Sequence, residues 1–96
     1  MGQLADNIRK AVRDNRYVIG DHADERLKER RIMDWQVIAG LEDARLLTER
    51  EDSLPNPTAE FEASLADGTP IKAVWAWISR LRMAKLVTVH FCPRMA

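Results

Sequence analysis

The spacing of the apolar residues changes half-way along the chain, and this change is the strongest constraint on its fold. In the first half they recur every three or four residues, as in Leu4, Ile8 and Val12, which is typical of helices with one buried side. In the second half they alternate with polar residues, as in segment 60–65, which is typical of half-buried strands. We therefore expect an α+β fold in which helices precede an antiparallel sheet.

The expected elements can be placed along the chain. Asp21 and Asp34 suit the N-cap position of the second and third helices. A short extended piece at Tyr17–Ile19 separates the first two helices. Helices are predicted over residues 3–14, 22–31 and 35–41, strands over 45–50, 60–65, 71–78 and 85–91, a proline-containing loop over 53–58 and a hairpin turn at Asp67-Gly68.

The 96 residues suffice for one domain, 1–96, and are too few for two. Strands joined by short turns pair with their chain neighbours, and a sheet face is kept dry by helices. The prediction is therefore N-terminal helices packed on one face of a roughly four-stranded antiparallel sheet. In the last strand, alternation places Val87 and Val89 on one face and Leu86, Thr88 and His90 on the other.

Charge and cysteine content exclude some classes of protein. The chain has 15 basic and 15 acidic side chains, which argues against coating nucleic acid by bulk charge but leaves room for a local basic site. Cys92 is the only cysteine, so no disulfide forms within the chain and a reducing compartment is the simplest setting. There is no apolar run of membrane-spanning length and no signal-peptide core. We expect a cytoplasmic protein of bacterial type.

The second predicted helix carries the most informative cluster. His22, Arg26 and Arg30 are four residues apart and therefore share one side, with Arg31 next to them. Arginine supplies permanently charged donors for phosphate oxygens, and histidine moves protons near neutral pH. The same residues also fit a solvated helix face with local ion pairs, in which His22 is a capping or packing residue. Both interpretations stay open at the level of sequence.

His90 is the second histidine, and Thr88 precedes it on the same strand face. RNA cleavage by transesterification needs a base for the 2′-hydroxyl, an acid for the leaving oxygen and a cation for the developing charge. We therefore assign His22, Arg26 and His90 as catalytic candidates, provided that the two imidazoles meet. The candidate phosphate or RNA contacts are Arg30, Arg31, Thr88 and Lys85. A metal site made of His22, His90 and Cys92 matches no familiar zinc spacing, so neither metal nor cofactor is expected.

Short motifs resemble a known family. The segments Val18-Ile19-Gly20-Asp21-His22-Ala23, Glu25-Arg26-Leu27 and Glu29-Arg30-Arg31-Ile32 resemble the opening of the domain of unknown function 4258 family. Asp34-Trp35-Gln36-Val37-Ile38 fits the helix that follows, and the resemblance covers about residues 17–91. Gly20 departs from the family pattern, which has Ser or Thr two residues before the histidine.

The resemblance implies a RelE-like or barnase–colicin-like fold. It also implies a toxin of a toxin–antitoxin pair that cleaves RNA without a metal, with His22, Arg26 and Arg30 or Arg31 as matched residues. The implied partners are RNA and a cognate zinc-finger antitoxin of the MqsA type. Two alternatives come from the residues themselves: a non-enzymatic protein- or RNA-binding module that uses segment 49–52 or the tryptophans, and a metal-binding protein that uses His90 and Cys92.

Overall fold

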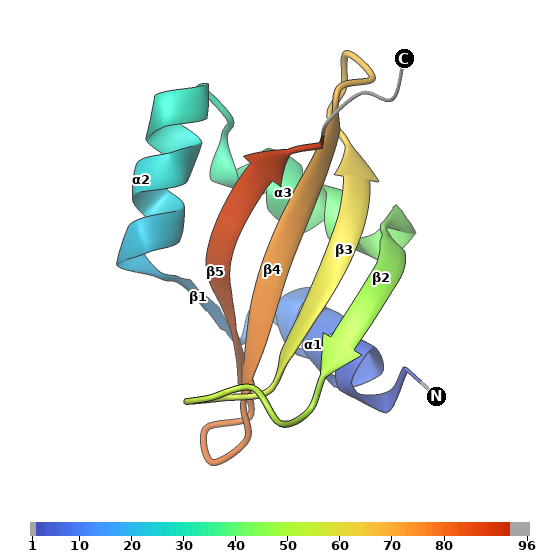
Figure 1. The fold of residues 1–96 in the computed structure, drawn as a ribbon, viewed down its shortest axis with the longest axis vertical. Helices are drawn as coiled ribbons and strands as arrows, with labels where there is room; N and C mark the ends of the chain where they lie inside the picture. Colours follow the sequence, from blue (N-terminus) through green and yellow to red (C-terminus); the bar gives the residue numbers. More distant parts are fainter. Residues whose placement is uncertain (1, 93–96) are drawn as a thin grey trace.

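The computed structural model describes residues 2–92, which form three helices packed on a five-stranded, mostly antiparallel open sheet (Figure 1). The predicted α+β class is confirmed. The helices are α1 (Gln3–Arg13), α2 (Asp21–Arg30) and α3 (Asp34–Gly40), and a 3-10 turn η1 (Leu41–Asp43) follows α3. The strands are β1 (Tyr17–Ile19), β2 (Arg45–Arg50), β3 (Thr58–Ser64), β4 (Pro70–Ile78) and β5 (Met83–Phe91), in the spatial order β1-β5-β4-β3-β2.

The sheet has one strand more than the sequence predicted. Strands β2 to β5 form the expected antiparallel meander. The extended piece β1 adds a fifth strand that runs parallel to β5, with Tyr17 opposite Ala84 and Ile19 opposite Leu86. The predicted roughly four-stranded antiparallel sheet is therefore present, but it is extended at this edge by a parallel strand. A three-residue segment shows no periodicity, so its pairing with a distant strand leaves no mark in the sequence.

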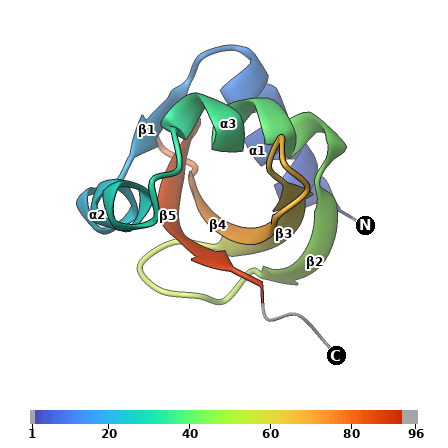
Figure 2. The ribbon, with the colours of Figure 1, turned by 90° about the horizontal axis from the view of Figure 1, so that it is seen from above.

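The core lies between the sheet and helices α1 and α3. The sheet curves around these two helices, which fill its concave side (Figure 2). The predicted apolar stripe of α1, including Ile8 and Val12, is buried there. Trp75 and Phe61 are the largest fully buried side chains, and they face the same layer from β4 and β3. Trp35 of α3, by contrast, is 62% exposed and lies outside the core.

A β-bulge changes which side chains of β5 face outward. Val74 of β4 lies opposite Thr88, but the next residue, Trp75, lies opposite Leu86, so Val87 is an extra residue. Leu86 and Val89 are therefore both buried on the helix side. The strict alternation predicted for this strand is wrong at Leu86. Thr88 pairs with Val74, on the outer face of the sheet.

Helix α2 lies along β5 and outside the layer of α1 and α3 (Figures 1 and 2). The Gly20 N–H donates a hydrogen bond to the Leu86 carbonyl at 2.9 Å. A Cβ atom at Gly20 would lie 2.9 Å from that same oxygen, so a glycine permits this close approach. Ala23 and Leu27 then bury one side of α2 against the core.

The predicted N-caps are each displaced by one residue. Gly20 and Met33 occupy the N-cap positions of α2 and α3, and Asp21 and Asp34 are the first helical residues. Neither aspartate makes a capping hydrogen bond, but both lie where the helix dipole favours a negative charge. In α3 the capping contact comes from Gln36, whose side-chain oxygen accepts the Met33 N–H at 3.0 Å.

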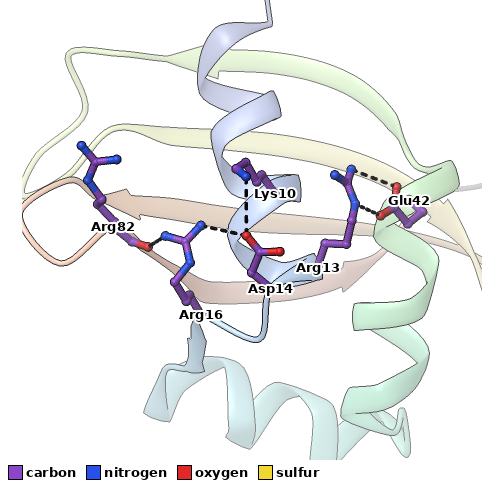
Figure 3. A network of polar contacts seen from close by, with 6 residues as sticks. All are labelled: Lys10, Arg13, Asp14, Arg16, Glu42 and Arg82. Carbon is purple, nitrogen blue, oxygen red and sulfur yellow. Dashed lines mark hydrogen bonds and ion pairs between the residues drawn. The ribbon is translucent and has the colours of Figure 1, made fainter.

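Polar contacts fix the end of α1 to the rest of the molecule (Figure 3). Arg13 pairs with Glu42 of η1 at 2.6 Å. Arg16 pairs with Asp14 at 3.2 Å and donates to the backbone carbonyl of Arg82, in the turn between β4 and β5. Among residues 2–92, none of the helices has the length and apolar character of a membrane span.

Candidate functional site

The three polar residues predicted to share one side of α2 do so. The Arg26 Nε atom donates to the His22 Nε2 atom at 3.5 Å, one helical turn away. His22 is exposed, whereas the Arg26 and Arg30 side chains are only 30% and 26% exposed. The structure therefore holds this His–Arg row at the surface, with the guanidinium groups partly shielded from solvent.

His90 lies on the outer face of β5, opposite Lys72 of β4. It borders a shallow hollow of about 360 Å³ together with Lys72, Phe91 and Cys92. Residues of α2 do not line this hollow. The α2 row and the His90 hollow are thus neighbouring features rather than one pocket.

The two features are electrostatically coupled. The pKa of His90 is lowered from its ordinary value, first because the imidazole is partly buried and then because nearby positive groups repel a proton. These groups are Lys72, Arg30, His22 and Arg26. The two histidines of the chain therefore lie within electrostatic reach of each other, with three further cations around them, and His90 is held in its neutral form at neutral pH.

Arg30 links α2 to the end of β5. Its guanidinium carbon lies 5.9 Å from the centre of the Phe91 ring, a cation–π distance. Phe91 itself is 46% exposed, which is high for a large aromatic residue. This contact brings the last turn of α2 against the end of β5.

Glu29 partly neutralises the α2 cations. Its carboxylate is hydrogen-bonded to Arg26 and lies 3.5 Å from the nearest guanidinium nitrogen of Arg30. Two guanidinium groups thus share one carboxylate, which leaves an excess of one positive charge on the three side chains. A phosphate that binds here has to compete with Glu29.

Lys72 is also paired. The Glu60 carboxylate bridges Lys72 at 3.2 Å and Arg50 at 3.1 Å across the outer face of the sheet. Burial alone would raise the pKa of Glu60, but the hydrogen bonds from Arg50 and Lys72 outweigh it and lower the pKa overall. The carboxylate is therefore ionised near neutral pH and holds the Lys72 side chain in place.

The remaining predicted contacts are more scattered. The Thr88 hydroxyl is buried and has no hydrogen-bond partner. Arg31 ends α2 in a left-handed conformation (φ 56°) with its side chain exposed. Lys85 is exposed near the opposite end of β5 from His90. The structure therefore places His22, Arg26 and Arg30 in one row on α2 and His90 in a neighbouring hollow on the sheet, with Lys85 at the far end of β5.

Sequence reasoning missed three participants. Lys72 and Phe91 enter the site through strand register, which the sequence does not reveal. Glu29 is different, because its spacing of three from Arg26 is a recognisable helical ion-pair signal. That signal belongs to the solvated-face interpretation, and the structure shows the local ion pairs that this interpretation expects.

Lys72 and Arg45 favour the thiolate of Cys92, but other effects outweigh them. Its burial, followed by the nearby Glu62 carboxylate, raises the pKa of the thiol, which keeps it protonated. Within the described part of the chain, no three or more His, Cys, Asp or Glu side chains are grouped as ligands for a metal ion.

Comparison with known proteins returns no relative. No protein-family model, curated protein or solved structure matches the chain. The resemblance to the domain of unknown function 4258 family therefore rests on the short motifs of residues 17–91 and stays a prediction.

Proposed function

We propose that the protein is a metal-independent endoribonuclease whose site lies where α2 meets the outer face of β5. The observation that carries this proposal is the contact of the α2 row with the end of β5. His22 is hydrogen-bonded to Arg26, Arg30 lies over Phe91, the residue after His90, and Lys72 lies opposite His90. Two imidazoles and several cations are the chemical groups that transesterification of RNA requires.

His90 suits the role of general base. Its lowered pKa leaves the imidazole neutral at pH 7, ready to take the proton of the 2′-hydroxyl. The 2′-oxygen then attacks phosphorus, and the bond to the 5′-oxygen breaks. The product strand ends in a 2′,3′-cyclic phosphate.

His22 suits the role of general acid. In the free protein its Nε2 atom accepts a hydrogen bond from Arg26. An arriving phosphate draws Arg26 toward its oxygens, and its negative charge favours a proton on His22. His22 then supplies that proton to the departing 5′-oxygen. Arg30 and Lys72 offset the charge that develops on the phosphate.

Cleavage of a fluorescently labelled RNA oligonucleotide in the presence of EDTA tests this function. His22→Ala and His90→Ala should each lower the rate by about a hundredfold to ten-thousandfold. An oligonucleotide with 2′-deoxyribose at the cleavage position should remain intact. Arg13→Ala is the matched control for Arg26→Ala, since Arg13 is also a helical arginine paired with a glutamate. Equal rates for wild type and the double histidine variant would sink the proposal.

The resemblance extends this proposal to a toxin with a zinc-finger antitoxin of the MqsA type. Expression in a bacterial host should then arrest growth, and His22→Ala should restore it at equal soluble protein levels. Unimpaired growth with soluble wild-type protein would contradict the toxin role. It would leave the result of the cleavage assay unaffected.

A second candidate is an RNA-binding module without catalysis. Two observations favour it: Glu29 shares its carboxylate between Arg26 and Arg30, and His22 does not line the hollow beside His90. This candidate expects RNA to bind unchanged in His22→Ala and to stay uncleaved. In either case Glu29→Gln should tighten RNA binding a few-fold, because it releases both guanidinium groups from a surface ion pair.

A protein-binding module draws on a different surface. Trp35 and Met33 are 62% and 60% exposed at the start of α3, and an exposed tryptophan is a common anchor at protein interfaces. Co-purification of a partner that Trp35→Ala releases, with no RNA binding by the free protein, would favour this reading.

A further inference from the structure

A second hollow lies on the outer face of the sheet, below the His90 site. The segment 51–57 between β2 and β3 folds back across this face (Figure 2). The Trp77 N–H donates to the Pro57 carbonyl at 2.9 Å and holds the end of this segment against β4. Between the segment and the sheet is a groove of about 330 Å³.

The groove has an apolar floor and a basic edge. Val74, Ala76 and Val87 contribute from the sheet, and Leu54, which is 89% exposed, contributes from the segment. Asn56 adds an amide with both donors and acceptors. Lys85, at the edge, is exposed, and within residues 2–92 no carboxylate pairs with it.

Strands β4 and β5 carry charges of one sign, whereas the segment over the groove begins with Glu51 and Asp52. Asp67 is the last acidic residue of the sequence, and five basic residues follow it. Strands β4 and β5 and the turn between them therefore carry lysine, arginine and histidine but no carboxylate. Although the net charge of the chain is zero, the hairpin formed by β4 and β5 is basic, which complements an anionic polymer.

The groove and the His90 site are on one path. His90 lies opposite Lys72, and Lys85 lies opposite Ala76, four residues further along β4. Four strand residues span about 13 Å. An extended single strand that passes His90 can therefore continue along the same face to Lys85.

We propose that this groove holds an unpaired base of the RNA strand whose backbone crosses the His90 site, with Lys85 on a phosphate. The inference rests on the proposed function and names a subsite for its substrate. The volume lies at the lower end of small-molecule sites, which suits one planar ring with its sugar. Apolar side chains pack against the faces of the ring, and Asn56 is placed to read a base edge.

Binding of a labelled 2′-O-methyl hexanucleotide, which lacks the attacking hydroxyl, tests the subsite apart from cleavage. Fluorescence anisotropy over a range of salt concentrations gives the affinity and its salt dependence. Lys85→Gln should weaken binding several-fold and reduce the slope of log K against log salt by about one. Leu54→Ala should weaken binding and leave the slope unchanged, because it removes apolar contact only.

Lys10→Gln is the matched control. Lys10 is an exposed lysine of α1, on the opposite side of the sheet, and it should change neither quantity. All three side chains are exposed, and circular dichroism confirms that each variant keeps its fold.

The outcomes separate the two proposals. Equal binding by Lys85→Gln, Leu54→Ala and Lys10→Gln overturns the base subsite and leaves the nuclease assay to stand by itself. Weakened binding by Lys85→Gln and Leu54→Ala, with no cleavage of unmodified RNA by the wild-type protein, supports the subsite and contradicts the nuclease function. A wild-type protein that does not bind the oligonucleotide overturns the subsite outright.

Discussion

Replacing Thr88 by valine should make the protein more stable. The Thr88 hydroxyl is buried on the outer side of β5 and has no hydrogen-bond partner, so folding removes it from water without compensation. Such an unsatisfied group costs about 1–3 kcal/mol. Valine has nearly the same shape, and its methyl group adds up to about 0.8 kcal/mol of apolar burial. We expect Thr88→Val to raise the free energy of unfolding by about 1–2 kcal/mol.

Urea denaturation followed by tryptophan fluorescence measures this change. For a small domain with a slope of about 1–2 kcal/mol per molar urea, the midpoint should rise by roughly 1 M. The melting temperature should rise by about 4–8 °C for each kcal/mol. Thr48→Val is the control, because Thr48 is a half-buried strand residue whose hydroxyl is not among the buried groups without a hydrogen-bond partner. It should shift stability by less than about 0.5 kcal/mol.

A loss of 1 kcal/mol or more in Thr88→Val would refute this reasoning, since it would mean that the hydroxyl has a partner in solution. RNA binding gives a second readout. Because the hydroxyl is not exposed to solvent, we expect Thr88→Val to bind RNA like wild type. Weaker binding by the stabilised variant would restore Thr88 to the predicted RNA contacts and imply that β5 shifts when RNA binds.

Three further predictions concern the scaffold and its response to pH. Arg9 donates to the Leu41 and Ala44 carbonyls at 3.4 and 2.7 Å and covers the Phe61 ring at 5.0 Å, so Arg9→Ala should cost about 2–4 kcal/mol in denaturation experiments. Stability should fall as the pH drops below 6.5, because the pKa of His90 is lowered in the folded protein and the unfolded chain therefore binds the proton more readily. His90→Gln should abolish this loss. The lowered pKa of Glu60 predicts a second loss of stability below about pH 4.5. Trp35→Ala should change the unfolding free energy by less than about 1 kcal/mol, because the side chain lies outside the core.

The elements of the fold were predictable because most of them carry a clear periodicity. Helix α1 and the antiparallel strands follow from apolar spacing alone. The parallel pairing of β1 could not be predicted, because Tyr17–Ile19 is too short to show a periodic pattern and its partner strand is distant in the chain. The bulge at Val87 was also hidden, since Leu, Val and Thr are all good strand residues and none marks a register shift.

Only the part of the candidate site that lies on helix α2 was predictable from the sequence. His22, Arg26 and Arg30 are related by helical spacing, so their common side follows from the sequence. The place of His90 depends on two features without a local signal, the β5 bulge and the position of α2 beside that strand. Gly20 is the residue that joins them, since its close approach to the Leu86 carbonyl starts α2 along β5.

The neutral total charge counts less against an RNA site than it first appears. Every acidic residue lies at or before Asp67, whereas the outer faces of β4 and β5 carry Lys72, Lys85 and His90 and no carboxylate. Attraction of a polyanion depends on the local field, which at an ionic strength of 0.15 M is screened over about 8 Å. A strand of RNA over β5 therefore meets the basic hairpin, and the carboxylates of the site, Glu29 and Glu60, are paired with arginine or lysine. Net charge averages over the whole chain, whereas a nucleic acid on this face meets only the local charges of β4, β5 and α2.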